Sequence, residues 1–94
     1  MGAGHREGMG WMPPIGEVAG WRAYVYMEQN HKTPHFHLRK AGVVVSLLPD
    51  GAVLAGALPA GDLRVVREWA STRTEAIIQA FNDVQEGKSP QWIP

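Results

Sequence analysis

Three of the four histidines of the chain lie close together, at His31, His35 and His37. Imidazole side chains bind transition metals and exchange protons near neutral pH. Phe36 separates His35 from His37, and residues two apart on a β-strand point to the same face, roughly 6.5–7 Å apart along the strand. At that distance two imidazoles can converge on one metal ion or one anion. The segment 30–39 is therefore the candidate functional site.

One interpretation of these histidines is a metal centre. His31, His35 and His37 would supply three ligands and leave a fourth position to water, as in catalytic zinc sites. Glu28 or Asp50 could add a carboxylate ligand or a general base. The cofactor expected for such a site is a divalent transition metal such as zinc.

A second interpretation needs no metal, and a third gives the histidines a structural role. In the second, His35, His37, Tyr26 and Arg39 act as acid, base and phosphate clamp for RNA cleavage. The formal net charge of zero, from nine basic and nine acidic residues, disfavours nucleic-acid binding through many phosphates but leaves room for a local patch. In the third, His31 caps a loop, His35 bonds a backbone carbonyl and His37 pairs with a tyrosine or glutamate across strands.

Two alternating segments are expected to position these side chains. Residues 35–40 alternate polar and apolar, which predicts a strand with Phe36 and Leu38 in the core and His35, His37 and Arg39 on the other face. Residues 21–28 also alternate, and antiparallel pairing through a loop at 29–34 would merge the two polar faces. The predicted core side of 21–28 holds Trp21, Ala23, Val25 and Met27, and its polar side holds Arg22, Tyr24, Tyr26 and Glu28.

Further strands are expected around this pair. The β-branched run 43–48 is typical of a central strand with both faces covered. Pro49, Asp50 and Gly51 form a strong turn signal, after which residues 52–56 would close a meander. Residues 16–20 are predicted to be a turn-rich lead-in rather than a strand.

From Ala60 onward the apolar spacing becomes helical. An unbroken helix over 61–86 would be about 39 Å long, more than so small a domain covers easily. Thr72 and Glu75 form a capping-box pattern at its midpoint, so two helices are expected at 62–71 and 73–86, with Gly87 as the C-terminal cap. In the tail 88–94, Trp92 and Ile93 are expected to dock. The apolar stripe consists of Val66, Ala70, Ile77, Phe81 and Val84.

The composition is that of one small globular domain. The chain has 94 residues, of which 45% are hydrophobic and 19% charged, and it has no cysteine for disulfides or thiolate chemistry. Residues 1–11 are expected to be a flexible N-terminal extension, with Met12 a more natural start, and residues 12–94 a single α+β domain. The predicted fold is an antiparallel meander of about four strands, packed on one face by two C-terminal helices. The chain has no apolar run long enough for a membrane span and no signal-peptide pattern, so a cytoplasmic location is expected.

The histidine segment resembles a known family motif. His31, Pro34, His35 and His37 match the H-x-P-P-H-x-H pattern of a bacterial family catalogued as domain-of-unknown-function family 4160, with Thr33 in place of its first proline. The resemblance covers nearly all residues after Trp11. Ala80 and Phe81 depart from it, because relatives tend to carry Asn-Trp there. The other matching segments are Met12-Pro13, Ile15, Gly20-Trp21, Tyr26, Leu58-Pro59, 66–70, 86–88 and 92–94.

The resemblance implies a class of function but no established activity. Members are often encoded beside another small protein, as in toxin–antitoxin pairs. The implied function is a partner-binding component of such a two-gene system, with the histidine-centred surface as its functional patch. The partner would be the small protein of the neighbouring gene, and a homo-oligomer is the other association considered. The alternatives are a small metal-dependent hydrolase or nuclease and the metal-free ribonuclease-type site.

Overall fold

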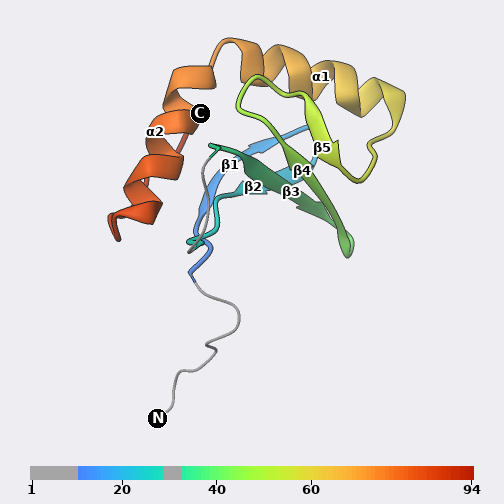
Figure 1. Cartoon of the computed structure of the whole chain (residues 1–94). Helices are drawn as coiled ribbons and strands as arrows, with labels where there is room; N and C mark the ends of the chain where they lie inside the picture. The colour runs from blue at the N-terminus through green and yellow to red at the C-terminus, as the bar shows by residue number, and fades with distance from the viewer. Residues whose placement is uncertain (1–10, 29–32) are drawn as a thin grey trace.

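Five antiparallel strands and two C-terminal helices make up the computed structural model, which describes residues 11–28 and 33–94 (Figure 1). The strands follow one another in the sheet in the order β1-β2-β3-β4-β5, a simple meander. This confirms the predicted α+β fold, with one strand more than expected. In chain order the elements are β1 (Pro14–Val18), β2 (Trp21–Tyr24), β3 (Phe36–Lys40), β4 (Val43–Leu47), β5 (Val53–Ala55), α1 (Ala60–Ser71) and α2 (Thr74–Gln85).

Strand β1 is the additional strand, so the prediction of a turn-rich lead-in at 16–20 was wrong. It pairs with β2, and Glu17 lies opposite Arg22. The turn is limited to Ala19 and Gly20, which have φ values of 53° and 82°. Glycine suits position 16 of this strand because the surrounding atoms leave little room for a side chain. A Cβ at Gly16 would lie 3.0 Å from the carbonyl oxygen of Ile93, so the position favours the residue without a side chain.

The helix-facing side of the sheet forms the core. Phe36 and Leu38 are fully buried there, as the alternation predicted. Met27 does not belong to the core, because β2 ends at Tyr24 and the side chain of Met27 is 39% exposed. The prediction of a strand covered on both faces at 43–48 was also wrong, since Val43 and Val44 are exposed. The other buried residues of the sheet and its flanks are Ile15, Val18, Trp21, Ala23, Val25, Val45 and Leu47.

No helix of residues 11–28 and 33–94 covers the opposite side of the sheet, which we call the open face. In Figure 1, α1 lies along the other side of the sheet and α2 descends beside one end of it. The strand register places the open-face residues in two neighbouring rows. The first row is Arg22, Arg39 and Val44, and the second row is Tyr24, His37 and Ser46.

The predicted break between two helices is confirmed, but its mechanism differs from the prediction. Thr72 forms no side-chain cap for α2. Instead the side chain of Arg73 donates hydrogen bonds to the carbonyl oxygens of Trp69 and Pro94, which joins the end of α1 to the C-terminal segment. Helix α2 ends at Gln85, and Gly87 caps it as expected. Gly87 has a φ of +79°, the Lys88 N–H donates to the Asp83 carbonyl, and the Gly87 N–H donates to the Val84 carbonyl.

The C-terminal segment covers the edge of β1. Ile93 is buried, and its N–H donates a 2.8 Å hydrogen bond to the carbonyl of Ile15. Trp92 does not dock as predicted, since it remains 51% exposed. Among the described residues, no helix is long and apolar enough to cross a membrane. Most of the predicted extension 1–11 lies outside the described residues, and Trp11, its last residue, accepts a backbone hydrogen bond from Met27.

Candidate functional site

The pairing of β2 with β3 brings the predicted polar residues to one surface. Tyr24 lies directly opposite His37, and Arg22 lies opposite Arg39. Beyond the end of β2, the ring of Tyr26 stacks on the imidazole of His37, with centroids 4.1 Å apart. Residues paired directly across antiparallel strands share a face, so the two polar faces merge as predicted.

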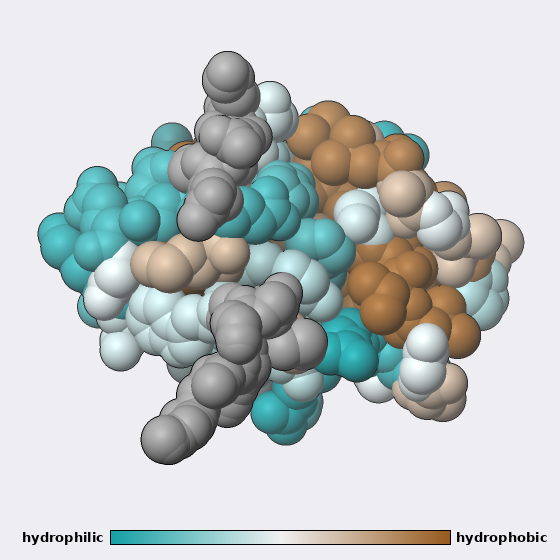
Figure 2. Space-filling model, turned by 60° about the horizontal axis from the view of Figure 1, so that its bottom comes forward, coloured by the Kyte–Doolittle hydropathy of each residue, from teal (hydrophilic) through white to brown (hydrophobic). Residues whose placement is uncertain are grey.

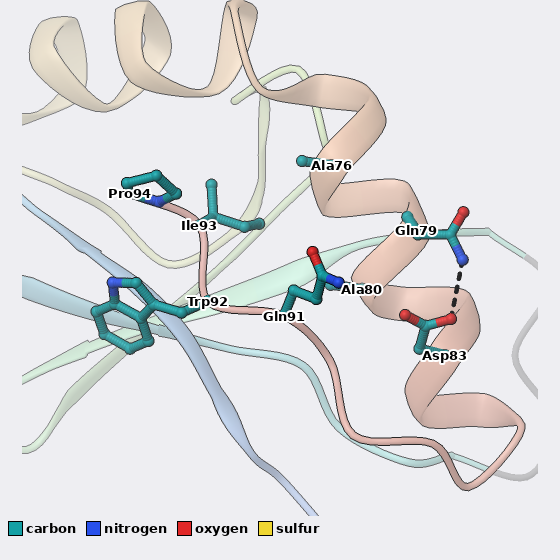
Figure 3. A pocket seen from close by; sticks show the side chains of 8 residues that line it. All are labelled: Ala76, Gln79, Ala80, Asp83, Gln91, Trp92, Ile93 and Pro94. Carbon is teal, nitrogen blue, oxygen red and sulfur yellow. Dashed lines mark hydrogen bonds between the residues drawn. The ribbon is translucent and has the colours of Figure 1, made fainter.

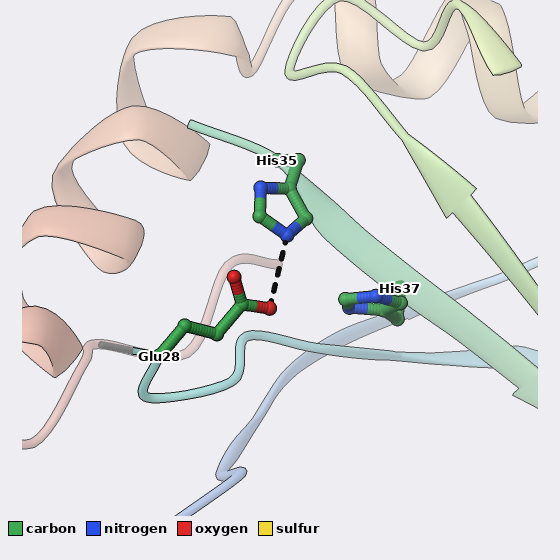
Figure 4. Close-up of side chains that lie close together, drawn as sticks. All are labelled: Glu28, His35 and His37. Atoms are coloured by element: carbon green, nitrogen blue, oxygen red, sulfur yellow. Dashed lines mark hydrogen bonds and ion pairs between the residues drawn. The ribbon is translucent and has the colours of Figure 1, made fainter. Parts of the chain in front are cut away.

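His35 lies between two hydrogen-bond acceptors. Its Nδ1 is 2.8 Å from the carbonyl oxygen of Thr33, and its Nε2 is 3.2 Å from Oε2 of Glu28 (Figure 4). The carbonyl can only accept, which assigns a proton to Nδ1. Nε2 then faces a carboxylate, and the pair is favourable when either a second proton or a cation lies between the two atoms.

His37 completes a cluster with these two residues. The potential ligand atoms of Glu28, His35 and His37 all lie within 4.8 Å of one another. We call these three residues the histidine cluster. Figure 4 shows the carboxylate of Glu28 and the ring of His35 pointing toward each other, with the ring of His37 beside them. The imidazole centroids of His35 and His37 are 5.3 Å apart, and Phe36 between them is buried in the core.

The electrostatics of His37 favour its neutral form. Burial lowers the pKa of His37 below its ordinary value, and the neighbouring charge of His35 lowers it further, while Glu28 acts in the opposite direction. The Nδ1 atom of His37 is buried and has no hydrogen-bond partner among the described residues. A neutral imidazole is the form that can bind a metal ion.

Helix α2 holds the histidine cluster in place from the side. The side chain of Gln85 accepts a 3.0 Å hydrogen bond from the N–H of Glu28 and donates a 2.7 Å hydrogen bond to the carbonyl of Tyr26. The ring of Phe81 lies 5.4 Å from the ring of His35. Gln85 was not predicted. Its only signal in the sequence is that it follows Phe81 by four residues and so continues the apolar stripe of the helix with a polar side chain.

The other residues predicted for the site, Arg39, Asp50 and His31, are not members of the histidine cluster that the structure describes. Arg39 shares the open face with His37 but contacts the ring of Tyr24, 5.8 Å from its centroid, rather than the cluster. Asp50 is not a member of the cluster, because its carboxylate accepts a 3.0 Å hydrogen bond from the N–H of Ala52 in the turn before β5. His31 falls outside the described residues, so its place as the third histidine ligand stays a prediction. In the described part of the chain, Glu28 supplies the third donor instead.

Two imidazoles and one carboxylate are a donor set suited to a single divalent transition metal. Zinc hydrolases and non-haem iron proteins both use this combination with positions left open for water or substrate. The Nδ1–H of His35 bonded to a backbone carbonyl is the outer contact that orients many metal-binding histidines. All three residues of the cluster are partly exposed, so solvent reaches it.

A separate hollow lies between α2 and the C-terminal segment. It has a volume of about 450 Å³ and is lined by Gln79 and Asp83 of α2 and by Trp92 of the C-terminal segment, among others (Figure 3). Gln79 donates a 2.8 Å hydrogen bond to Asp83. The hollow shares no residue with the histidine cluster and brings no group of metal-ligating side chains together in the described part of the chain.

Comparison with known protein families gives one match. Residues 20–82 match the model of a family described as a domain of unknown function, DUF4160. The matched region contains Glu28, His35 and His37 but ends before Gln85. Comparison with curated proteins and with solved structures gave no significant match.

Proposed function

The chain belongs to the DUF4160 family, whose function is unknown, and from its geometry we propose that it is a metal-dependent hydrolase. Glu28, His35 and His37 are the proposed ligands of one divalent transition metal. The observation that carries the proposal is the convergence of their ligand atoms to within 4.8 Å of one another. The cytoplasm remains the expected location.

The charges of the histidine cluster support this proposal. A cation between Nε2 of His35 and the carboxylate of Glu28 would satisfy both acceptors at once, and the neutral ring of His37 would add a third donor. Three protein ligands leave coordination positions for water. A bound divalent metal lowers the pKa of such a water to about 7, which makes it a nucleophile under physiological conditions.

Metal titration of the purified, untagged protein tests the proposal. Calorimetry with Zn²⁺, and visible absorption with Co²⁺, should show one ion bound per chain. Glu28→Gln, His35→Ala and His37→Ala should each weaken binding by at least about 10-fold, because the first removes the negative charge of a ligand and the other two each remove a nitrogen donor. Glu75→Gln is the matched control, since it removes an exposed carboxylate at the start of α2.

The same experiment can contradict the proposal. Absence of stoichiometric binding to the wild type, or equal affinity of the three cluster variants and the control, would rule out a metal centre here. His31→Ala shows whether the predicted third histidine is a further ligand. RNA cleavage that persists unchanged after chelation would instead favour the metal-free site of His35, His37, Tyr26 and Arg39.

Binding of a partner protein is the second candidate function, and an exposed strand edge favours it. Strand β5 is the last strand of the sheet, and its residues are exposed, with Leu54 at 53%. Val43 and Val44 on the neighbouring hairpin are exposed as well. Figure 2, a view from below the sheet as drawn in Figure 1, shows a hydrophobic area on one half of the molecule. Exposed apolar strand edges pair readily with another chain.

The proposed partner is the small protein of a neighbouring gene, as in a toxin–antitoxin pair, and a second copy of the chain is the other occupant to test. Leu54→Lys should abolish co-purification with that partner, because a charge in the middle of the edge opposes pairing. Glu75→Gln again serves as the control. Unchanged co-purification of Leu54→Lys would exclude β5 as the binding edge, and a wild type whose mass stays that of one chain would exclude a second copy.

A further inference from the structure

Among the described residues, the open face carries an arginine whose charge is not compensated by an acidic group. Arg22 and Arg39 are directly opposite each other on β2 and β3, an arrangement that is unfavourable for like charges. Glu17 neutralises Arg22 through a 2.7 Å ion pair. Arg39 has no acidic partner among the described residues, and its guanidinium lies over the ring of Tyr24 in a cation–π arrangement. The net effect is a positive charge available on the open face.

This charge lies next to the histidine cluster. Arg39 follows His37 by two residues on β3, so the two side chains leave the same face about 6.5–7 Å apart. Tyr24, which the guanidinium contacts, is the residue directly opposite His37. The guanidinium therefore leans toward the row of the sheet that contains His37.

A hydroxyl group on the neighbouring strand β4 also lies next to His37. Ser46 on β4 lies directly opposite His37 and is partly exposed. Its hydroxyl has no hydrogen-bond partner within residues 11–28 and 33–94. A guanidinium two residues along the strand from His37 and a hydroxyl across from it are the donors with which proteins bind phosphoryl oxygens, and Arg does so with two parallel hydrogen bonds.

We propose that Arg39 and Ser46 bind a phosphoryl group, so that the substrate of the metal centre is a small phosphate ester such as a nucleotide. This inference rests on the proposed hydrolase function. One water is consumed for each ester hydrolysed. Its oxygen forms a new bond to phosphorus, the bond from phosphorus to the ester oxygen breaks with its electron pair, and the departing alcohol takes a proton from the water. The zero net charge of the chain favours a small ester over a polynucleotide, which needs many phosphate contacts.

Phosphate binding can be tested without any metal. Inorganic phosphate is titrated into the metal-free protein while the amide and arginine Nε–H signals are followed by NMR. The signals of Arg39 and Ser46 should shift, and Arg39→Gln should weaken binding by at least about 10-fold. Arg64→Gln, which removes an exposed arginine of α1, is the matched control. Equal phosphate affinity in Arg39→Gln and Arg64→Gln would overturn the proposal.

Activity measurements test the substrate class. With the metal-loaded protein, Arg39→Gln should lower kcat/KM for p-nitrophenyl phosphate by about 100-fold or more. Hydrolysis of p-nitrophenyl acetate, which has the same leaving group but no phosphoryl group, should fall by a much smaller factor in this variant. Equal losses with both esters would contradict a phosphate subsite. Faster turnover of single-stranded RNA than of the small ester would overturn the assignment to small esters.

Separate measurements of metal binding and phosphate binding distinguish a failure of the proposed hydrolase from a failure of the proposed phosphate subsite. Zn²⁺ affinity should be the same in the wild type, Arg39→Gln and Ser46→Ala, because neither side chain is a proposed ligand. A protein that binds phosphate through Arg39 but binds no metal would contradict the hydrolase and leave the phosphate subsite standing. A protein that binds metal but shows no Arg39-dependent phosphate binding would contradict the subsite alone.

Discussion

Gln85, the last residue of α2, donates a 2.7 Å hydrogen bond from its side-chain amide to the backbone carbonyl of Tyr26. The same amide group accepts a hydrogen bond from the N–H of Glu28. Gln85 thus pairs with the chain beyond β2 in the way a neighbouring strand would, and it holds the backbone that carries the Glu28 carboxylate. The helix that completes the core therefore also positions one proposed ligand.

We predict that Gln85→Ala lowers both stability and metal affinity. Loss of the two partly buried hydrogen bonds should reduce the free energy of unfolding by about 1–3 kcal/mol, measured by urea denaturation. Zn²⁺ affinity should fall by about 10–100-fold, because Glu28 is no longer held toward His35. Gln79→Ala is the control, since Gln79 is exposed and its side chain bonds Asp83 on the same helix. Equal effects of the two variants would show that Gln85 has no special role.

We predict that acid destabilises the metal-free protein through His37. Its pKa in the folded state is below the ordinary value of 6.5, mainly because the ring is buried. The unfolded chain therefore binds the proton more readily, and as the pH falls below about 6.5 this difference favours unfolding until the lower folded-state pKa is passed. The free energy of unfolding should fall less steeply in this range for His37→Asn than for the wild type. Identical slopes in the two proteins would show that His37 does not contribute.

We predict that the two apolar residues of the C-terminal segment differ strongly in their effect on stability. Ile93→Ala should reduce the free energy of unfolding by about 2–4 kcal/mol, because Ile93 is buried against the core. Trp92→Ala should change it by only about 0.5 kcal/mol, because half of the Trp92 side chain is exposed. Thermal or chemical denaturation measures both values. A larger loss for Trp92→Ala would mean that the indole is docked after all.

We predict that two glycines with similar backbone conformations tolerate alanine differently. Gly42 and Gly56 have φ values of +83° and +89°, so alanine should cost about 1 kcal/mol of strain at either position. At Gly56 a Cβ would also lie 2.9 Å from the carbonyl oxygen of Val44, whereas at Gly42 it would meet nothing within 4 Å. Gly56→Ala should therefore destabilise the protein by at least about 1 kcal/mol more than Gly42→Ala in denaturation experiments. Equal losses would indicate that β5 moves to accommodate the methyl group.

Much of the fold could be predicted because it depends on local patterns. The alternation around Phe36 and Leu38 predicted the strand and its buried face, and the helical spacing from Val66 to Val84 predicted both helices. Strand β1 could not be predicted in this way. Pro14 and Gly16 are poor strand formers, and the segment is held between β2 on one side and the distant Ile93 on the other. The exposure of Val44 likewise follows from its place on the open face, which the apolar run 43–48 does not reveal.

The candidate site likewise combines features that the sequence predicts with features that only the tertiary structure decides. The chain alone determined that His35 and His37 leave one face of a strand with Phe36 buried between them, because side chains two residues apart on a strand share a face. Only the tertiary structure decided that Glu28 is the third donor of the cluster, that Gln85 holds its backbone and that Arg39 has no acidic partner among the described residues. These relationships depend on the register between β2 and β3 and on the return of α2 to the sheet. Both are set by packing between segments far apart in the chain, which local residue patterns do not specify.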